Sequence, residues 1–222
     1  MLSQEDTKLL CETDAGTPMG ELFRRFWIPV LISDELPEPD CTPIAIKILG
    51  EELLAFRDTN GKVGLISAFC AHRHAMLFWG RNEQCGIRCT YHGWKYDVDG
   101  NCVDMPNEPP ESKFQDKVKI QAYPTREAGS CVWAYMGPKA LEPKEIPHLE
   151  WARLPNSNVQ VTKRLQENNW AQATEGGIDS SHISYLHNMD LENITPSTAD
   201  KAPLMQIVLR DFGFIDAGRR VQ

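Results

Sequence analysis

The sequence predicts a β-rich antiparallel domain followed by the start of an α+β domain. Short apolar runs separated by turn residues fill the first part of the chain, and a Cys- and His-rich stretch without a sustained period interrupts them. A helical segment with two histidines then follows a proline-rich stretch. The 222 residues, 41% of them hydrophobic, can bury the core of one domain and part of another.

The first elements are a short helix and a β-meander. Residues 17–28 open with Thr-Pro and place apolar side chains at three-to-four spacing, which predicts an amphipathic helix. Residues 42–57 predict two strands around Gly50 and Glu51. Asn60-Gly61 then predicts a tight turn into a third strand at residues 63–67.

Loops, strands and one helix are expected along the rest of the chain. Residues 70–110 suit two ligand-bearing loops with a short ribbon between them, and strands are predicted at 117–122 and 130–136. Four prolines in residues 138–157 predict a linker, followed by a strand at 159–165, a helix at 169–187 and a strand at 204–210. The predicted organisation is a segment with a short helix at 1–26, a first domain at 27–137, the linker at 138–157 and a partial second domain at 158–222.

Composition argues against several classes of protein. A net charge of −8 disfavours a nucleic-acid partner, because phosphates would repel such a surface. The chain has no run of 18 apolar residues and no secretory signal pattern at its N-terminus, so we expect a cytoplasmic protein without a membrane partner. The cysteines, seven in number, have no small-scaffold spacing and do not predict a disulfide framework.

Two of these cysteines lie in a metal-ligand pattern. Cys70-x-His72 is followed after 16 residues by Cys89-x-x-His92. Two thiolates and two imidazoles are the ligand set of a Rieske [2Fe–2S] cluster, in which a His pair replaces a Cys pair on one iron. A structural zinc site accepts the same ligand types, but the Cys-x-His half is tighter than the usual zinc spacing. The pattern therefore favours the iron–sulfur cluster.

A second set of candidate ligands lies in the predicted helix at 169–187. His182 and His187 are five residues apart, and Asp179 lies three residues before the first. On an ideal helix these imidazoles would diverge by about 140°, so the helix must be irregular if both are to bind one ion. Gly176 and Gly177 make such irregularity plausible. Two histidines and one carboxylate form the facial triad of non-haem Fe(II) oxygenases.

The two motifs together resemble the oxygenase (alpha) component of Rieske non-haem iron aromatic ring-hydroxylating oxygenases, especially the phthalate 4,5-dioxygenase-like group. The resemblance rests on Cys89-Thr-Tyr-His92-Gly-Trp-Lys-Tyr-Asp97 and on the pattern from Asn169 to His187, and covers most of residues 17–187. It implies a Rieske domain followed by the truncated start of a helix-grip-like α+β catalytic domain. His74 stands where many relatives carry glycine, and a loop histidine at the surface is expected there.

Roles for individual residues follow from this resemblance. The cluster would be held by Cys70, His72, Cys89 and His92, with Tyr91 and Trp94 shielding it or forming hydrogen bonds. His182 and His187 would bind mononuclear Fe(II), and Asp179 would connect the iron site to His92 of a neighbouring subunit in a ring, expected to be a trimer. The family's third iron ligand is a carboxylate much further along the chain. It is therefore assigned to none of the carboxylates that follow His187, namely Asp190, Glu192, Asp200, Asp211 and Asp216.

The resemblance also implies a reaction. Electrons from an NAD(P)H-dependent flavin and iron–sulfur reductase would pass through the cluster to the iron, for O2-dependent dihydroxylation of a phthalate-like aromatic carboxylate. Two alternatives remain open: an aryl-ether O-demethylase or other monooxygenase, and a fragment that acts only as an electron carrier. The 222-residue chain alone is expected to be inactive, because the iron site lacks its third ligand.

Overall fold

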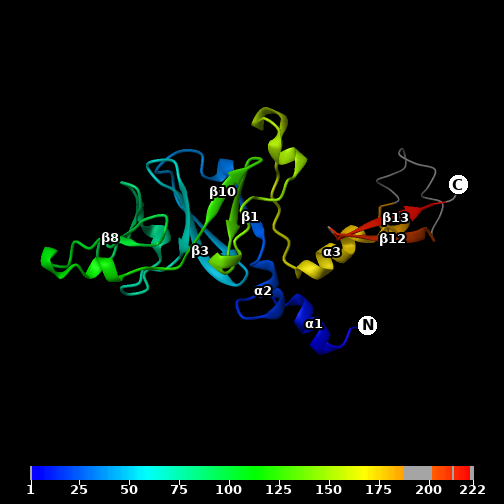
Figure 1. The fold of residues 1–222 in the computed structure, drawn as a ribbon, viewed down its shortest axis with the longest axis horizontal. Coiled ribbons are helices and arrows are strands. Elements are labelled where there is room, and N and C mark those ends of the chain that lie inside the picture. Colours follow the sequence, from blue (N-terminus) through cyan, green and yellow to red (C-terminus); the bar gives the residue numbers. More distant parts are fainter. Residues whose placement is uncertain (1, 188–201, 212, 221–222) are drawn as a thin grey trace. The chain divides into compact units, whose positions relative to one another are not determined.

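The computed structural model describes residues 2–187, 202–211 and 213–220. The chain divides into two compact units at residues 165 and 166 (Figure 1). The helices are α1 (Gln4–Cys11), α2 (Pro18–Phe23), α3 (Trp170–Ile178) and α4 (Ile183–Leu186). The strands are β1 (Trp27–Ile32), β2 (Ile44–Ile48), β3 (Glu51–Arg57), β4 (Val63–Ser67), β5 (Arg81–Asn82), β6 (Ile87–Arg88), β7 (Lys95–Tyr96), β8 (Cys102–Asp104), β9 (Ala122–Tyr123), β10 (Thr125–Ala128), β11 (Cys131–Tyr135), β12 (Leu204–Arg210) and β13 (Gly213–Arg219).

The helix predicted at 17–28 is confirmed over a shorter range, as α2. Thr17 caps α2 by accepting a hydrogen bond from the Gly20 amide, and Pro18 occupies the first turn, as the sequence predicts. The helix ends at Phe23, and Phe26 is exposed. Trp27, which the helical pattern included, instead begins β1, because its side chain packs in the core beside Trp133 and Tyr135.

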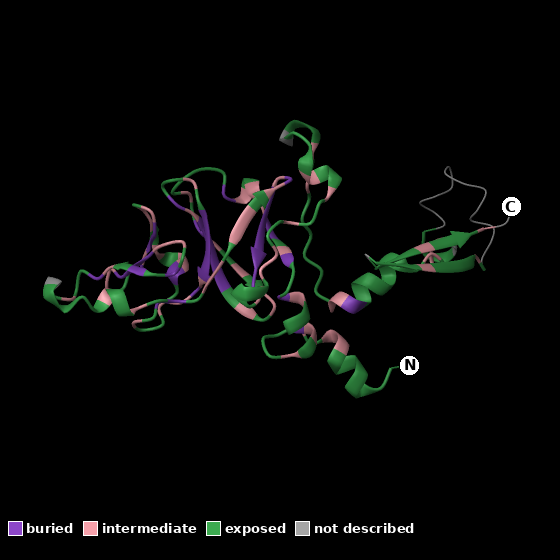
Figure 2. Ribbon diagram, in the orientation of Figure 1, coloured by how far each residue is buried: buried purple, intermediate pink, exposed green. Residues whose placement is uncertain are grey.

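The predicted meander is confirmed and forms the central sheet of the first unit, in the order β2-β3-β4-β9. Its middle strands are buried on both faces, as Figure 2 shows. Leu53 and Leu65 pack in one core cluster with residues of β1 and β11, whereas Leu54 and Ile66 pack in another cluster with the Cys- and His-rich segment. Burying each of these side chains stabilises the fold by about 1.5–3 kcal/mol.

A second sheet, in the order β1-β11-β10, covers one face of the meander. The sequence predicts β11 but not β1, because the predicted helix at 17–28 overlaps the start of this strand. The strand β1 lies at the edge of this sheet and contains Pro29, with a bulge between Pro29 and Leu31. A proline is tolerated in an edge strand or at a bulge, because the amide hydrogen that it lacks is not needed to bond a second neighbouring strand.

A third, small sheet carries the Cys- and His-rich segment, in the order β5-β6-β7-β8. The strand predicted at 117–122 is wrong for most of its length: residues 114–117 form a 3-10 helix, and β9 contains only Ala122 and Tyr123. The reason is that this segment changes partner. Val118 and Ile120 bond to Cys102 and Gly100, whereas Gln121 bonds to Ser67 of the central sheet.

The later elements confirm some predictions and correct others. Residues 159–165 form no strand, and Lys163 there is ion-paired with Glu35. The single helix predicted at 169–187 is instead two helices, α3 and α4, with a break at residues 179–182. The break precedes both histidines and does not lie between them, because residues 182–187 form one helical turn. The predicted strand at 204–210 is β12, which pairs with β13 as a hairpin. The predicted fold class, an antiparallel β domain followed by a second unit with helices and strands, is confirmed.

Candidate metal centres

The four candidate cluster ligands lie on two loops with the same backbone hydrogen bonds. We call residues 69–76 the first ligand loop and residues 88–95 the second ligand loop. In the first, the Cys70 amide donates to Ala75 and the Cys70 carbonyl accepts from His74. In the second, Cys89 bonds in the same way to Trp94 and Gly93. In each loop, the residue before the cysteine pairs in antiparallel β fashion with the residue seven positions later: Phe69 with Met76, and Arg88 with Lys95.

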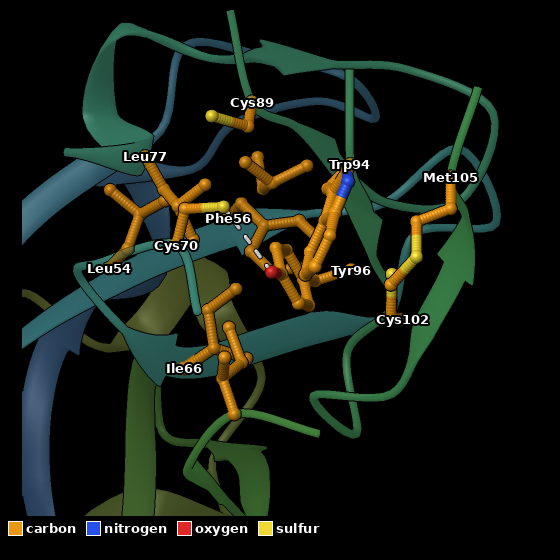
Figure 3. Close-up of a cluster of buried hydrophobic side chains, with 12 residues drawn as sticks. Leu54, Phe56, Ile66, Cys70, Leu77, Cys89, Trp94, Tyr96, Cys102 and Met105 are labelled. Atoms are coloured by element: carbon orange, nitrogen blue, oxygen red, sulfur yellow. Dashed lines mark hydrogen bonds between the residues drawn. The ribbon is translucent and has the colours of Figure 1, made fainter. Parts of the chain in front are cut away.

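Both candidate thiols are buried in the core cluster below these loops (Figure 3). The Cys70 sulfur lies 3.3 Å from the hydroxyl of Tyr96, which also accepts the Ala71 amide at 3.1 Å. Burial raises the pKa of Cys89, and the neighbouring Cys70 raises it further, whereas the amides of Tyr91 and His92 lower it. Two buried thiols beside each other therefore need a cation or metal to become thiolates.

The two candidate imidazoles face each other, with ring centroids 4.5 Å apart. His72 stacks on the buried indole of Trp94, at 4.5 Å and 8° between planes. Its Nδ1 atom is buried and has no hydrogen-bond partner. Burial lowers the pKa of His72, and His92 and Arg73 lower it further, which favours the neutral ring that can donate a lone pair.

These observations fit a Rieske cluster. A buried imidazole nitrogen without a partner destabilises the fold, and a metal ion can bind the lone pair of such a neutral nitrogen. Among the described residues, no group of three or more His, Cys, Asp or Glu side chains is arranged around one ion. A Rieske cluster does not require such a group, because each of its two irons takes only two protein ligands.

The residues around the ligands differ in exposure. Trp94 is buried and donates its indole N–H to Asn107 at 2.6 Å, whereas Tyr91 is 64% exposed with its ring 4.0 Å from that of His92. Sequence reasoning assigned no role to Tyr96, although its hydroxyl lies against the sulfur of the candidate ligand Cys70. An aromatic residue in a short strand is more often a core residue, so its pattern carried no signal.

The second candidate site is partly formed in the second unit. His182 caps the start of α4 and His187 follows its end, with ring centroids 5.3 Å apart. Asp179 Oδ2 lies 3.2 Å from His182 Nδ1. The Ser181 amide lowers the pKa of Asp179, and the bond to His182 lowers it further, so this carboxylate is ionised. Because Asp179 occupies Nδ1, Nε2 is the ring nitrogen of His182 that could bind a metal.

The structure brings no third ligand to these histidines within its described residues. Asp190, Glu192 and Asp200 lie outside the described residues. Asp211 lies directly after β12, and Asp216 lies within β13 opposite Ile207.

Comparison with known proteins places this arrangement in a family. The family model of the Rieske [2Fe-2S] domain matches residues 26–124, and that of the LigXa C-terminal-like domain matches residues 134–221. The chain belongs to the Rieske oxygenase family. Its cofactor in the first unit is accordingly a [2Fe–2S] cluster.

Three relatives illustrate the similarity. A phthalate 4,5-dioxygenase oxygenase subunit from Pseudomonas putida is 44% identical, with 99% of this chain and 53% of the relative covered. A 5,5'-dehydrodivanillate O-demethylase oxygenase subunit from a Sphingobium strain is 36% identical, with 96% and 51% covered. The solved terminal oxygenase of carbazole 1,9a-dioxygenase from Nocardioides aromaticivorans is 26% identical, with a TM-score of 0.61 and 84% and 52% covered.

The chain spans about half the length of the curated relatives that it matches. In the described part of this Rieske oxygenase chain, no helix is both long and apolar enough to cross a bilayer.

Proposed function

We propose that this chain is part of an oxygenase component that carries electrons from a Rieske cluster to a mononuclear Fe(II) for O2-dependent hydroxylation of an aromatic carboxylate. The observation that carries this proposal is the pair of matching ligand loops, with buried Cys70 and Cys89 and the unpartnered Nδ1 of His72. In it, Cys70 and Cys89 hold one iron of the cluster, and His72 and His92 hold the other. When bound, such a cluster supplies one-electron transfer at moderate potential.

The surrounding residues fix and shield these ligands. Trp94 covers the face of His72 and excludes water from it, and its bond to Asn107 fixes the indole plane. Tyr91 covers His92 from the exposed side. The Tyr96 hydroxyl holds the Cys70 sulfur from below and accepts the Ala71 amide, so it ties the first ligand loop to β7.

In the second unit, we propose that His182 and His187 bind the mononuclear iron. Their position on either side of α4, after the break in the helix, supports this assignment. Asp179 orients the His182 ring through Nδ1. The third ligand of the facial triad is left unassigned.

The substrate proposal rests on the relatives. A phthalate dioxygenase subunit is 44% identical over almost the whole chain, which supports dihydroxylation of a phthalate-like ring. The O-demethylase relative, at 36% identity over 96% of the chain, supports aryl-ether demethylation as the second candidate. Both reactions use aromatic substrates, and the product distinguishes them.

The proposed partners are a reductase with flavin and iron–sulfur centres, and further copies of this chain. A ring of three subunits would let Asp179 of one subunit approach His92 of the next, so that electrons cross between subunits. The predicted domain boundaries at 26, 137 and 157 and the cytoplasmic location also stay predictions.

The test uses the complete oxygenase component, with its reductase, NADH, O2 and phthalate. We expect acid-labile sulfide, two cluster irons, a low-average-g electron paramagnetic resonance (EPR) signal on reduction, and a dihydrodiol product from protein that also holds mononuclear iron. His182→Ala should remove the mononuclear iron and the product but keep the cluster signal, whereas the control His148→Ala, at an exposed histidine of the first unit, should change neither. Stoichiometric zinc without sulfide would refute the cluster assignment. Loss of the cluster signal in His182→Ala would refute the division into two sites.

A further inference from the structure

The two ligand loops adopt one backbone conformation with different residues at a critical position. Four residues after each ligand cysteine the chain has a positive φ, +57° at His74 and +79° at Gly93. Glycine adopts this left-handed region readily, whereas a residue with a Cβ is penalised there. The first ligand loop therefore contains an unfavourable conformation that the second avoids.

The residue before each cysteine contacts this position. In the second ligand loop, Arg88 donates a hydrogen bond from Nη1 to the Gly93 carbonyl at 2.7 Å. In the first, the Phe69 ring stacks on the His74 ring, with centroids 4.2 Å apart and 7° between planes. Phe69 and Arg88 occupy equivalent places, because both also pair with the residue seven positions later.

The space available for a side chain also differs between positions 93 and 74. A Cβ added at Gly93 would lie 2.6 Å from the Pro106 ring, so a side chain there would force Pro106 to move. Beside the first ligand loop, a surface cavity of about 390 Å³ is lined by Phe69, His72 and His74 among others. The His74 side chain is accommodated there, and its stack with Phe69 opposes relaxation of its backbone.

We propose that the Phe69–His74 stack is a positioning clamp that holds His72 in place for the cluster. His72 lies two residues before His74, so relaxation of the His74 backbone out of the left-handed region would move the His72 ring. The clamp holds the loop backbone in the left-handed conformation, as glycine and the arginine hydrogen bond do in the second ligand loop. This inference rests on the proposed ligation of the cluster by His72.

The experiment compares three variants of the protein as purified with its cluster: His74→Ala, His74→Gly and Phe69→Leu. Alanine retains the Cβ penalty but lacks the ring, whereas glycine removes both. We expect the half-life of the cluster under an iron chelator to fall about tenfold in His74→Ala, a factor within the range of the left-handed penalty. His74→Gly should stay within about threefold of the parent, because no penalty remains for the stack to offset.

Phe69→Leu tests the clamp from its other side. It should also shorten the half-life about tenfold, and addition of His74→Gly to it should restore the half-life to within about threefold of His74→Gly alone. The g-values of the reduced cluster should shift in His74→Ala and Phe69→Leu and return in the double variant, since they report the orientation of the ligand ring. Phe26→Leu, at an exposed phenylalanine before β1, is the matched control and should change neither quantity.

The outcomes separate the clamp from the ligand assignment. A parent protein that holds no Rieske cluster would overturn the ligation by His72 and the clamp with it. A parent with its cluster, but with equal half-lives for His74→Ala and His74→Gly, would overturn the clamp alone. The comparison at position 74 remains decisive even if Phe69→Leu does not fold.

Discussion

Removal of the Tyr96 hydroxyl should lower the reduction potential of the cluster. The hydroxyl oxygen accepts the Ala71 amide, so its proton is free to point at the Cys70 sulfur 3.3 Å away. Burial raises the pKa of Tyr96, and its bond to Cys70 raises it further, so the hydroxyl stays protonated as a donor. A bond to a cluster sulfur stabilises the reduced state more, because that state carries one more negative charge.

The size of the effect follows from the strength of such a bond. If reduction strengthens the hydrogen bond by about 0.5–1 kcal/mol, Tyr96→Phe lowers the potential by about 20–45 mV, since 59 mV corresponds to a tenfold change in a one-electron equilibrium. The variant also leaves the Ala71 amide without its partner, which costs about 1–3 kcal/mol of stability. Both changes are large enough to measure.

The assay is a redox titration followed by visible absorbance, with thermal unfolding measured on the same samples. Tyr135→Phe is the matched control, because Tyr135 is equally buried and donates its hydroxyl to the Pro138 carbonyl at 2.9 Å, outside the core cluster that contains the candidate thiols. The control should lose stability without a change in potential. A potential for Tyr96→Phe that is unchanged or higher than the parent's would refute the reasoning.

Four further predictions test the ligands, the electron path, the core and one ion pair. His92→Cys should lower the cluster potential in the same titration, because a thiolate donates more charge to iron than imidazole does. Asp179→Asn should leave both metals in place but slow cluster oxidation in single-turnover stopped-flow measurements with substrate and O2; an unchanged rate at equal iron content would leave Asp179 only a structural role. Leu54→Ala should reduce the free energy of unfolding by about 2–5 kcal/mol in urea titrations, because Leu54 is fully buried. Hydrogen bonds from Arg57 lower the pKa of Glu127 from 4.5, so the stability that they contribute should be present above that pH and lost on acidification below it. The loss should be less than about 1 kcal/mol, because the Glu127 side chain is 40% exposed. Arg57→Met should abolish this part of the pH dependence of unfolding.

The ligand types, their spacing and the local elements that depend on neighbouring residues could be predicted from the amino-acid sequence. Thr17-Pro18 started a helix and Asn60-Gly61 turned one strand into the next, because these residues restrict their own backbone angles. In each case the controlling interaction lies within a few residues.

Features that depend on partners far along the chain could be seen only in the folded protein. The segment 117–122 looks like one strand, but its residues bond to two different sheets. Tyr96 is an ordinary core aromatic by its pattern, yet its hydroxyl lies against Cys70, which is 26 residues away. The matching hydrogen bonds of the two ligand loops, and the stack that replaces glycine at His74, appear only when both loops are folded. Side-chain periodicity specifies which face of an element is apolar, whereas packing and strand register determine which distant atom that face meets.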